Sequence, residues 1–178
     1  MDYKFKTEPY KHQLHALGAS HNKENYALFM EMGTGKSKVL IDNIAMLYDK
    51  GKINAALIVA PKGVYRNWER QEIPNHMPEH VIYNIITWTP SATKKQDAEN
   101  RKLFKHGEEL VIFLMNIEAF STKKGLKIAE KFLFSHSALM AIDESTTIKS
   151  PTASRTKNVL KLRDYAKYRR ILTGSPVT

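Results

Sequence analysis

Residues 33–37, GTGKS, combine small, hydroxyl and basic side chains in an order that suits phosphate binding. Glycines let successive amides turn towards phosphate oxygens, and a helix that begins at Lys36 adds the positive end of its dipole. Lys36 can carry its charge to terminal phosphates, and the Ser37 hydroxyl can ligate Mg²⁺. The usual pattern opens with another glycine, where this chain has Met30. A damaged site and a chance match in a flexible turn are therefore the alternatives to an intact nucleotide site.

Two adjacent acids, Asp143 and Glu144, directly follow the apolar run ALMAI. A phosphate loop needs a carboxylate for Mg²⁺, which Asp143 is placed to provide, while Glu144 can polarise the attacking water as general base. The alternative is the first turn of a helix, where acids are favoured. The last apolar run is followed by TGS at 173–175, which predicts either a simple turn or a hydroxyl-bearing loop that senses the nucleotide.

Short apolar runs alternate with longer amphipathic segments along the chain. The predicted strands are 26–30, 55–60, 81–88, 110–116, 138–143 and 170–173, and the predicted helices are 36–49, 64–73, 94–106, 125–134 and 154–165. A further helix is predicted to open at Pro9 and to close near Gly18. This alternation predicts the α/β class, with a parallel sheet covered by helices on both faces. Ligands bind such sheets at the carboxyl ends of the strands, so the residues just after each apolar run are candidates for the site.

Five segments resemble, in order, the motifs of superfamily two helicases, and more narrowly of the Swi/Snf-type DNA-dependent ATPases. They are PYKHQ, MGTGKS, IVAPKGVYRNWERQEI, IDESTTIKS and ILTGSP, and the resemblance runs from about residue 7 to residue 178. That group has an acid–Met pair where other phosphate loops begin with glycine, and Glu31-Met32 matches it. The Ile148-Lys149 pair separates the group from the DEAD-box RNA helicases.

The resemblance implies that residues 1–178 form a single N-terminal RecA-like helicase domain with a P-loop, which binds ATP and Mg²⁺. Gln13 matches the family's adenine-reading glutamine, which implies ATP rather than GTP, and Tyr10 stands near it. The family grips the DNA backbone after the second and fourth strands, through phosphate contacts with little reading of sequence. A solvated loop charge is an equal alternative for Lys62.

The resulting site prediction assigns each residue a role. The predicted residues are, for catalysis, Lys36, Asp143 and Glu144; for nucleotide binding, Gln13, Gly33, Thr34, Gly35, Lys36, Ser37 and Lys38; for Mg²⁺, Ser37 and Asp143; for coupling, Thr173, Gly174 and Ser175; and for nucleic acid, Pro61, Lys62, Asn116, Thr122 and Lys149. The chain departs from the family at Ser145-Thr146, which replace Ala-His, and at Ser150, which replaces Asn. These departures concern coupling rather than the Mg²⁺ and base positions.

The family's motor has two RecA-like domains, and the second supplies an arginine finger to the nucleotide. The resemblance covers only the first domain, so we expect a fragment, or a chain completed by a partner that carries the second domain. Loss of such a finger costs ~10³–10⁵ in rate in related enzymes. We therefore expect little turnover and no translocation from this chain alone.

Composition limits the class of protein. The formal net charge of +10 favours a polyanionic partner, although many soluble proteins are basic. The absence of cysteine excludes disulfides and thiolate metal sites, and no apolar run is long enough to span a membrane. We expect a cytoplasmic protein, and the compact, lysine-rich chain resembles translocases of tailed bacteriophages. Packing is the expected role of Trp68 and Trp88.

The leading hypothesis is the ATP-binding motor domain of an ATP-dependent translocase or helicase on duplex DNA. A non-hydrolysing nucleic-acid or protein-binding module that keeps the fold is the alternative from another class, and intact Lys36, Asp143 and Glu144 argue against it. A small kinase with an unrelated phosphate loop is a third hypothesis, against which the order of the five motifs argues.

Overall fold

The computed structural model describes residues 3–90, 93–105, 107–144 and 154–174. Its six strands form one parallel sheet in the order β1–β6–β5–β2–β4–β3. The strands are β1 (Asn25–Phe29), β2 (Ala55–Ala60), β3 (Tyr83–Thr87), β4 (Leu110–Asn116), β5 (Ala138–Asp143) and β6 (Tyr168–Thr173). The predicted α/β class, with a parallel sheet between helices, is confirmed.

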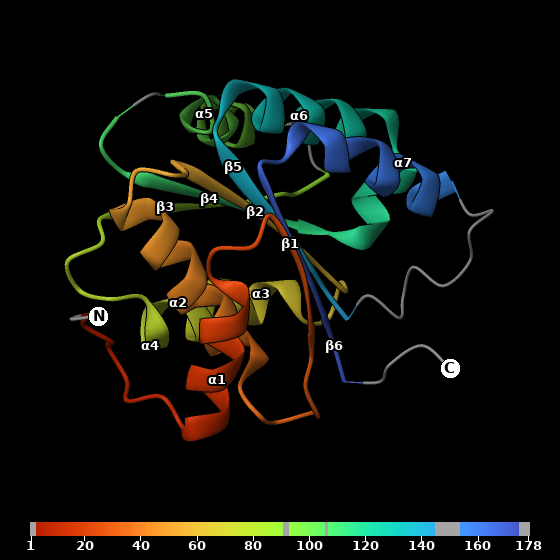
Figure 1. Ribbon diagram of the computed structural model, residues 1–178. Coiled ribbons are helices and arrows are strands. Elements are labelled where there is room, and N and C mark those ends of the chain that lie inside the picture. Colours follow the sequence, from red (N-terminus) through yellow and green to blue (C-terminus); the bar gives the residue numbers. More distant parts are fainter. Residues whose placement is uncertain (1–2, 91–92, 106, 145–153, 175–178) are drawn as a thin grey trace.

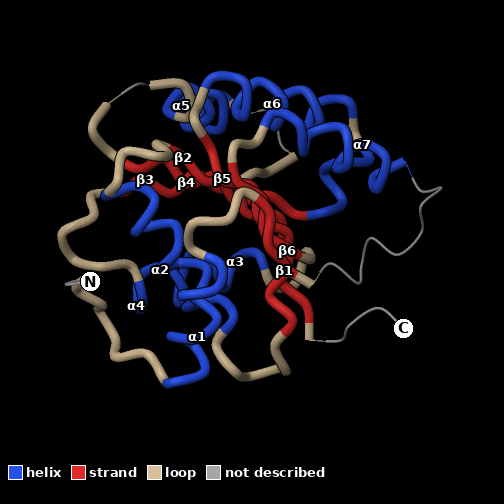
Figure 2. Tube along the Cα trace, viewed as in Figure 1, coloured by secondary structure: helices blue, strands red, loops and turns tan. Residues whose placement is uncertain are grey.

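The helices form two layers, one on each face of the sheet (Figure 1). One layer holds α1 (Lys11–Ser20), α2 (Lys36–Asp49), α3 (Tyr65–Asn67), a π-helical turn (Trp68–Glu72) and α4 (Ile73–His76). The other holds α5 (Lys94–Lys102), a 3₁₀ turn (Ile117–Ser121), α6 (Lys123–Ser135), α7 (Ser154–Leu162) and a second 3₁₀ turn (Arg163–Tyr165). The tube view in Figure 2 shows the sheet between the two layers.

The central strands are apolar up to their last residue because both of their faces are covered. All six residues of β2 and all seven of β4 are buried. The side chains of β2 alternate between two separate cores: Ala56, Ile58 and Ala60 pack with α1 to α4, and Ala55, Leu57 and Val59 pack with α5 to α7.

The segment 64–73 was predicted as one helix but is irregular. Residues 68–72 form a π-helical turn in which the N–H of Ile73 bonds to the carbonyl of Trp68. Pro74 explains the irregularity, because it lacks an N–H and its ring crowds the carbonyl four residues earlier. The wider turn accommodates this loss and continues into α4.

The strand order decides which loops meet. Because β1, β6 and β5 are neighbours, the segments that follow Phe29, Thr173 and Asp143 emerge side by side at the carboxyl edge. Phe29 is paired with Thr173, and Asp143 lies opposite Leu172.

Across the described residues, no helix has the length and apolar character needed to cross a membrane.

Candidate functional site

The loop between β1 and α2 has the backbone shape of a phosphate loop. Gly33 and Gly35 adopt φ values of +77° and +83°, in the left-handed region that side chains disfavour. A Cβ at Gly35 would also collide with the side-chain amide of Gln13. The Thr34 hydroxyl donates to the carbonyl of Glu31 at 2.6 Å and tightens the turn. Both glycines are therefore required by conformation, and Gly35 also by space.

The first turn of α2 presents its amides to this loop. Gly35 is the N-cap, and the N–H of Val39 donates to the Gly35 carbonyl at 3.2 Å as the first bond of the helix. The amides of Lys36, Ser37 and Lys38 precede that bond, and such amides have no partner within a helix. No side chain in the described ranges caps this end. The arrangement suits an anion.

Lys36 is folded back over the loop. Its ammonium donates to the carbonyl oxygens of Met30 at 2.9 Å and Glu31 at 3.1 Å. Gly174, just after β6, lies against the same loop: a Cβ there would be 3.1 Å from the Met32 side chain and 3.8 Å from the Lys36 ammonium. The structure thus brings the predicted coupling residue Gly174 beside the predicted catalytic lysine.

Asp143 ends β5 with its carboxylate held at both oxygens. Oδ1 accepts from the backbone N–H of Glu144 at 3.0 Å, and Oδ2 accepts from the indole N–H of Trp68 at 3.0 Å. Burial raises the pKa of Asp143, with a smaller rise from Glu144, and the Trp68 hydrogen bond and the Lys36 charge act in the opposite direction. Glu144 has a φ of +50°, an unusual conformation for a residue with a side chain, of a kind that clusters at functional sites.

The residues present fit a Mg²⁺ ion. Asp143 offers a carboxylate, and Ser37, at the start of α2, offers a hydroxyl, which are the hard oxygen ligands that this ion prefers. The described part of the chain has no cluster of three or more His, Asp or Glu side chains for a metal. None is needed, because Mg²⁺ in nucleotide sites takes one or two protein oxygens and completes its shell with phosphates and water.

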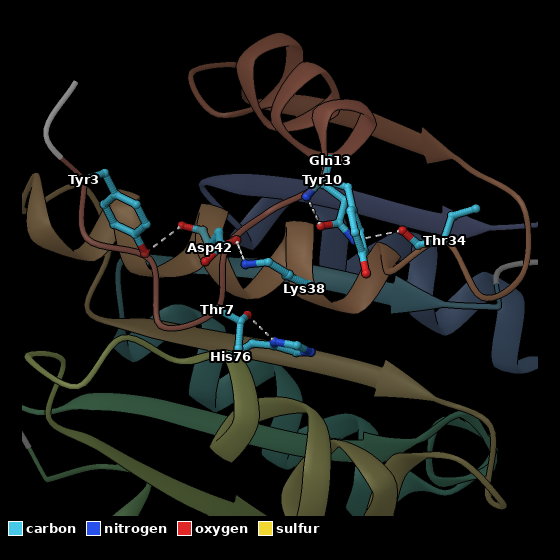
Figure 3. Close-up of polar contacts among 8 residues, drawn as sticks. All are labelled: Tyr3, Thr7, Tyr10, Gln13, Thr34, Lys38, Asp42 and His76. Atoms are coloured by element: carbon cyan, nitrogen blue, oxygen red, sulfur yellow. Dashed lines mark hydrogen bonds and ion pairs between the residues drawn. The ribbon is translucent and has the colours of Figure 1, made fainter.

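Gln13 ties α1 to the phosphate loop, as Figure 3 shows. Its Oε1 accepts from the N–H of Tyr10 at 3.0 Å, and its Nε2 donates to the carbonyl of Thr34 at 3.0 Å. The ring of His12 also contacts the Thr34 carbonyl, at 2.9 Å, and stacks on the exposed ring of Tyr10. A cleft of about 420 Å³ opens beside these residues and is lined by α1, β1 and Thr34. Adenine reading by Gln13 stays a prediction.

Lys38 points away from the loop. Its buried ammonium pairs with Asp42 at 2.8 Å, as Figure 3 shows. The same ammonium lies 5.2 Å from the ring centre of Phe5. The backbone amide of Lys38 is therefore the group through which its predicted contact with nucleotide can be made. The hydroxyl of Thr7 lies 2.9 Å from Nδ1 of His76 on α4. The segment before α1 is thus fastened to α2 and α4, and it delivers Tyr10 and Gln13 to the loop.

Four of the predicted nucleic-acid residues lie at or beyond the carboxyl ends of β2 and β4, and Asn116 is itself the last residue of β4. Pro61 follows β2, its carbonyl accepts from the N–H of Tyr65 at 3.0 Å, and Lys62 is exposed. Asn116 is buried and its Oδ1 caps the 3₁₀ turn at Ala119 N, 2.9 Å away. Thr122 caps α6 at Gly125 N, 3.0 Å away. These caps account for Asn116 and Thr122 structurally, and contact with nucleic acid stays a prediction for all four residues.

The remaining assignments fall partly within and partly outside the described residues. Thr173 is buried at the end of β6, and its carbonyl accepts from Met30 N at 3.3 Å. Ser175 and Lys149 lie outside the described residues, as do Ser145, Thr146 and Ser150, which depart from the family. Trp88 is buried in the core beneath α5 and α6, which confirms its packing role.

Two sets of buried hydrogen bonds were missed by sequence reasoning. Trp68 packs in the core as predicted, but its indole N–H also bonds to Asp143. Arg170 was not singled out, yet it is 1 % exposed and links three segments. Its guanidinium donates to Asn43 Oδ1 at 2.9 Å, to Ser20 O at 2.9 Å and to Glu24 O at 3.2 Å. An arginine in a strand, next to apolar residues, was the only signal for it.

The chain matches known proteins over almost its whole length. The sequence profile of the SNF2-related domain matches residues 12–178. Among curated relatives, the chromatin-remodeling ATPase INO80 of Gibberella zeae is 29 % identical over 156 residues and that of Candida glabrata 27 % over 157. Each alignment covers 86 % of this chain but only 8 % and 10 % of those proteins.

Solved structures share the fold. The Sulfolobus solfataricus SWI2/SNF2 ATPase core in complex with dsDNA gives a TM-score of 0.72 at 20 % identity, over 99 % of this chain and 34 % of that one. The UvsW helicase from bacteriophage T4 gives 0.67 at 13 % identity, over 95 % and 53 %. The predicted RecA-like fold is confirmed by these likenesses. The profile match extends from α1, which carries Gln13, past Gly174, and the chain belongs to the SNF2-related domain family.

Proposed function

We propose that this domain binds Mg²⁺–ATP and is the ATP-binding part of a motor that moves along duplex DNA when a second RecA-like domain completes it. One observation carries the proposal: the phosphate loop, Asp143 and Gly174 follow three neighbouring strands and converge at one edge of the sheet. A structural turn at the loop would not need a buried carboxylate and a second glycine-bearing loop beside its lysine.

Each part of the site has a defined role in hydrolysis. The amides at the start of α2 and the ammonium of Lys36 hold the phosphate oxygens, and Lys36 leaves its carbonyl partners Met30 and Glu31 to do so. Ser37 and Asp143 would hold Mg²⁺, which supplies positive charge to the phosphates. Glu144 orients a water whose oxygen bonds to the terminal phosphorus as the bond to the ADP oxygen breaks.

The site is open where a second domain would close it. Met32, beside the phosphate loop and Gly174, is 82 % exposed. The chain spans about a tenth of the curated relatives that it matches, so their whole activity is not expected from it alone. We propose that a second RecA-like domain, in the same or a partner chain, covers this edge and supplies an arginine. Without it we expect nucleotide binding with little turnover.

DNA is the proposed track because the chain is strongly basic and a fold relative was solved in complex with dsDNA. The proposed contacts lie after β2 and β4, at Pro61, Lys62, Asn116 and Thr122, with Lys149 as a further candidate. They would bind phosphates and read little sequence. Location in the cytoplasm and a bacteriophage origin stay predictions.

Nucleotide affinity tests the site in this chain directly. A fluorescent ATP analogue should bind in the presence of Mg²⁺, and Lys36→Ala should weaken it strongly. Lys127→Ala, an exposed lysine on α6, is the matched control and should bind as the parent does. Equal binding by the parent and Lys36→Ala would contradict the assignment of the phosphate loop.

ATPase activity of the chain joined to a second RecA-like domain tests the motor. Duplex DNA should stimulate it, and comparison with single-stranded DNA and with RNA separates duplex tracking from strand separation and from RNA-directed activity. Absence of turnover, with the parent equal to its Lys36→Ala variant, would instead support the non-hydrolysing binding module.

A further inference from the structure

We propose that Trp68 is a positioning residue of this site: its indole N–H fixes the orientation of the Asp143 carboxylate through which the site would hold Mg²⁺. The inference rests on the proposed function, because it assigns to Trp68 a task within the same nucleotide site. It differs from a packing role, which would require only the apolar body of the ring.

The contact is buried and directional. Trp68 is 1 % exposed and Asp143 is 8 % exposed, and the Nε1–Oδ2 distance is 3.0 Å. The other oxygen, Oδ1, accepts from the Glu144 N–H at 3.0 Å. With one donor on each oxygen, the carboxylate cannot rotate about its last bond without losing both interactions. Each oxygen retains lone-pair capacity for a further ligand.

The backbone turn and the core packing around Trp68 also fix the position of its indole ring. Trp68 begins the π-helical turn and packs in the same core cluster as Ile73 and Met77. π-helical turns are rare and often mark functional sites. A buried indole N–H must find an acceptor, and a backbone carbonyl would satisfy it equally well. Here the acceptor is the carboxylate at the end of β5, 75 residues away in sequence.

The expected effect follows from how outer partners act on metal ligands. Removing a group that orients a ligand typically costs about 10–100-fold in metal affinity. Trp68→Phe keeps an aromatic body in the core but has no donor for Asp143. We therefore expect it to lose about 10-fold or more of the gain in nucleotide affinity that Mg²⁺ provides. Affinity measured without Mg²⁺ should change little.

The chain offers a matched control because it contains two tryptophans, Trp68 and Trp88. Trp88 is equally buried but lies in the core on the other face of the sheet, so Trp88→Phe removes an indole from the same kind of environment. The affinities of parent, Trp68→Phe and Trp88→Phe for a fluorescent ADP analogue are measured with Mg²⁺ and with excess chelator. Only Trp68→Phe should lose the Mg²⁺-dependent gain. An equal loss in both conditions would mean a packing role and would overturn the proposal.

Trp88→Phe also leaves Trp68 as the single tryptophan emitter, which gives a readout on an unaltered Trp68. Adding Mg²⁺ to the ADP-bound protein should change the indole emission, and the same addition to Trp88→Phe/Asp143→Ala should not. Unchanged emission in Trp88→Phe, together with ordinary Mg²⁺-dependent nucleotide binding, would overturn the inference and leave the proposed function standing. Failure of every variant and of the parent to bind nucleotide would overturn both.

Discussion

The face of the sheet covered by α1 to α4 buries charged and amide side chains, whereas the face covered by α5 to α7 is packed mainly by aliphatic and aromatic ones. Arg170, Lys38, Asp42 and Asn43 are buried on the first face. The second face is built around phenylalanines, which are fully buried: Phe113, Phe120 and Phe132. Of the two faces, only the first carries the phosphate loop and the Trp68–Asp143 contact.

The difference indicates that the first face has less favourable burial energy but a more fixed geometry. Burial raises the pKa of Asp42 despite its ion pair with Lys38, and burial lowers the pKa of Arg170 to about 10. Both shifts mean that the charged form is held at a cost in free energy. In return, the hydrogen bonds of Arg170 join α1, α2 and β6, three elements that carry or flank the site. We interpret this polar layer as the part that sets the position of α2 relative to β6.

The largest expected effect is a loss of stability from a substitution on the second face, without a loss of nucleotide affinity. Phe132→Ala should lower the free energy of unfolding by about 4 kcal/mol, because it empties a fully buried ring site that also contacts Phe113 and His136. The nucleotide affinity of the folded protein should not change. Denaturant unfolding and titration with a fluorescent ATP analogue measure the two quantities. Phe134→Ala, on the same helix but 81 % exposed, is the control, with a change within about 0.5 kcal/mol. A large loss of affinity in folded Phe132→Ala would show that the faces are not separable.

The next effect tests the buried pair on α2. Lys38→Met should lower the free energy of unfolding by about 3 kcal/mol, because it leaves the carboxylate of Asp42 buried without its cation. The double variant Lys38→Met/Asp42→Leu should recover most of that loss, since apolar replacement of a buried pair is often neutral. Urea unfolding of the two single variants and the double variant gives the coupling free energy. Additive losses would mean that the pair contributes nothing as a pair.

Arg170 should give a smaller loss of stability but a clear loss of function. Arg170→Met leaves the acceptors at Asn43 and Ser20 unpaired, but it also removes a buried charge. The net loss in free energy of unfolding should be about 2 kcal/mol. Nucleotide affinity should fall as well, because α1 and α2 lose their common anchor. Arg163→Met, on the exposed Arg163–Asp164 pair, is the control and should change neither quantity. Unaltered nucleotide affinity in Arg170→Met would remove the link between the polar layer and the site.

The sequence predicted the strands and the regular helices of both faces, and it failed at the irregular segment 64–73. Continuous apolar runs such as AALIVA and LVIFLMN predict buried parallel strands, and the helical segments 125–134 and 154–165 were found as α6 and as α7 with its 3₁₀ turn. The site could be predicted from the glycines, Lys36 and the two acids because each group lies in a short motif whose residues are adjacent in sequence. The alternation of strands and helices predicts a parallel sheet, which puts the phosphate loop, Asp143 and Gly174 at one edge. The strand order, which the sequence did not predict, makes them neighbours along that edge.

Contacts between distant segments could not be predicted in the same way. Lys38 was assigned to nucleotide from its place beside Ser37, but its side chain turns to Asp42 one helical turn later. A pair four apart in a helix can equally be solvated, and only burial by Phe5 decides between the two. The Trp68–Asp143 bond joins residues 75 apart in sequence, and Trp68 begins a π-helical turn, which no periodicity reveals. Asn116 ends β4 and Thr122 lies beyond it, and the structure gives both of them a role as helix caps that the sequence did not predict.

The smallest expected effect is on the pH dependence of stability. Burial lowers the pKa of His76 below its usual value of about 6.5, the charge of Lys38 acts in the same direction, and Glu72 opposes both. A depressed pKa in the folded state means that the unfolded chain binds the proton more readily. The stability that His76 contributes is therefore present above about pH 6.5 and is lost as the pH falls through its folded pKa.

The variant His76→Asn isolates this contribution, because the opposite effect expected from the raised pKa of Asp42 is common to both proteins. Between about pH 7.5 and about pH 5.5, the parent should lose more unfolding free energy in urea titrations than the variant does. His15→Asn, an exposed position on α1, should keep the slope of the parent. Equal slopes in all three proteins would mean that His76 and its contact with Thr7 do not determine how much unfolding free energy is lost at low pH. Carboxylates elsewhere in the chain would then determine that loss.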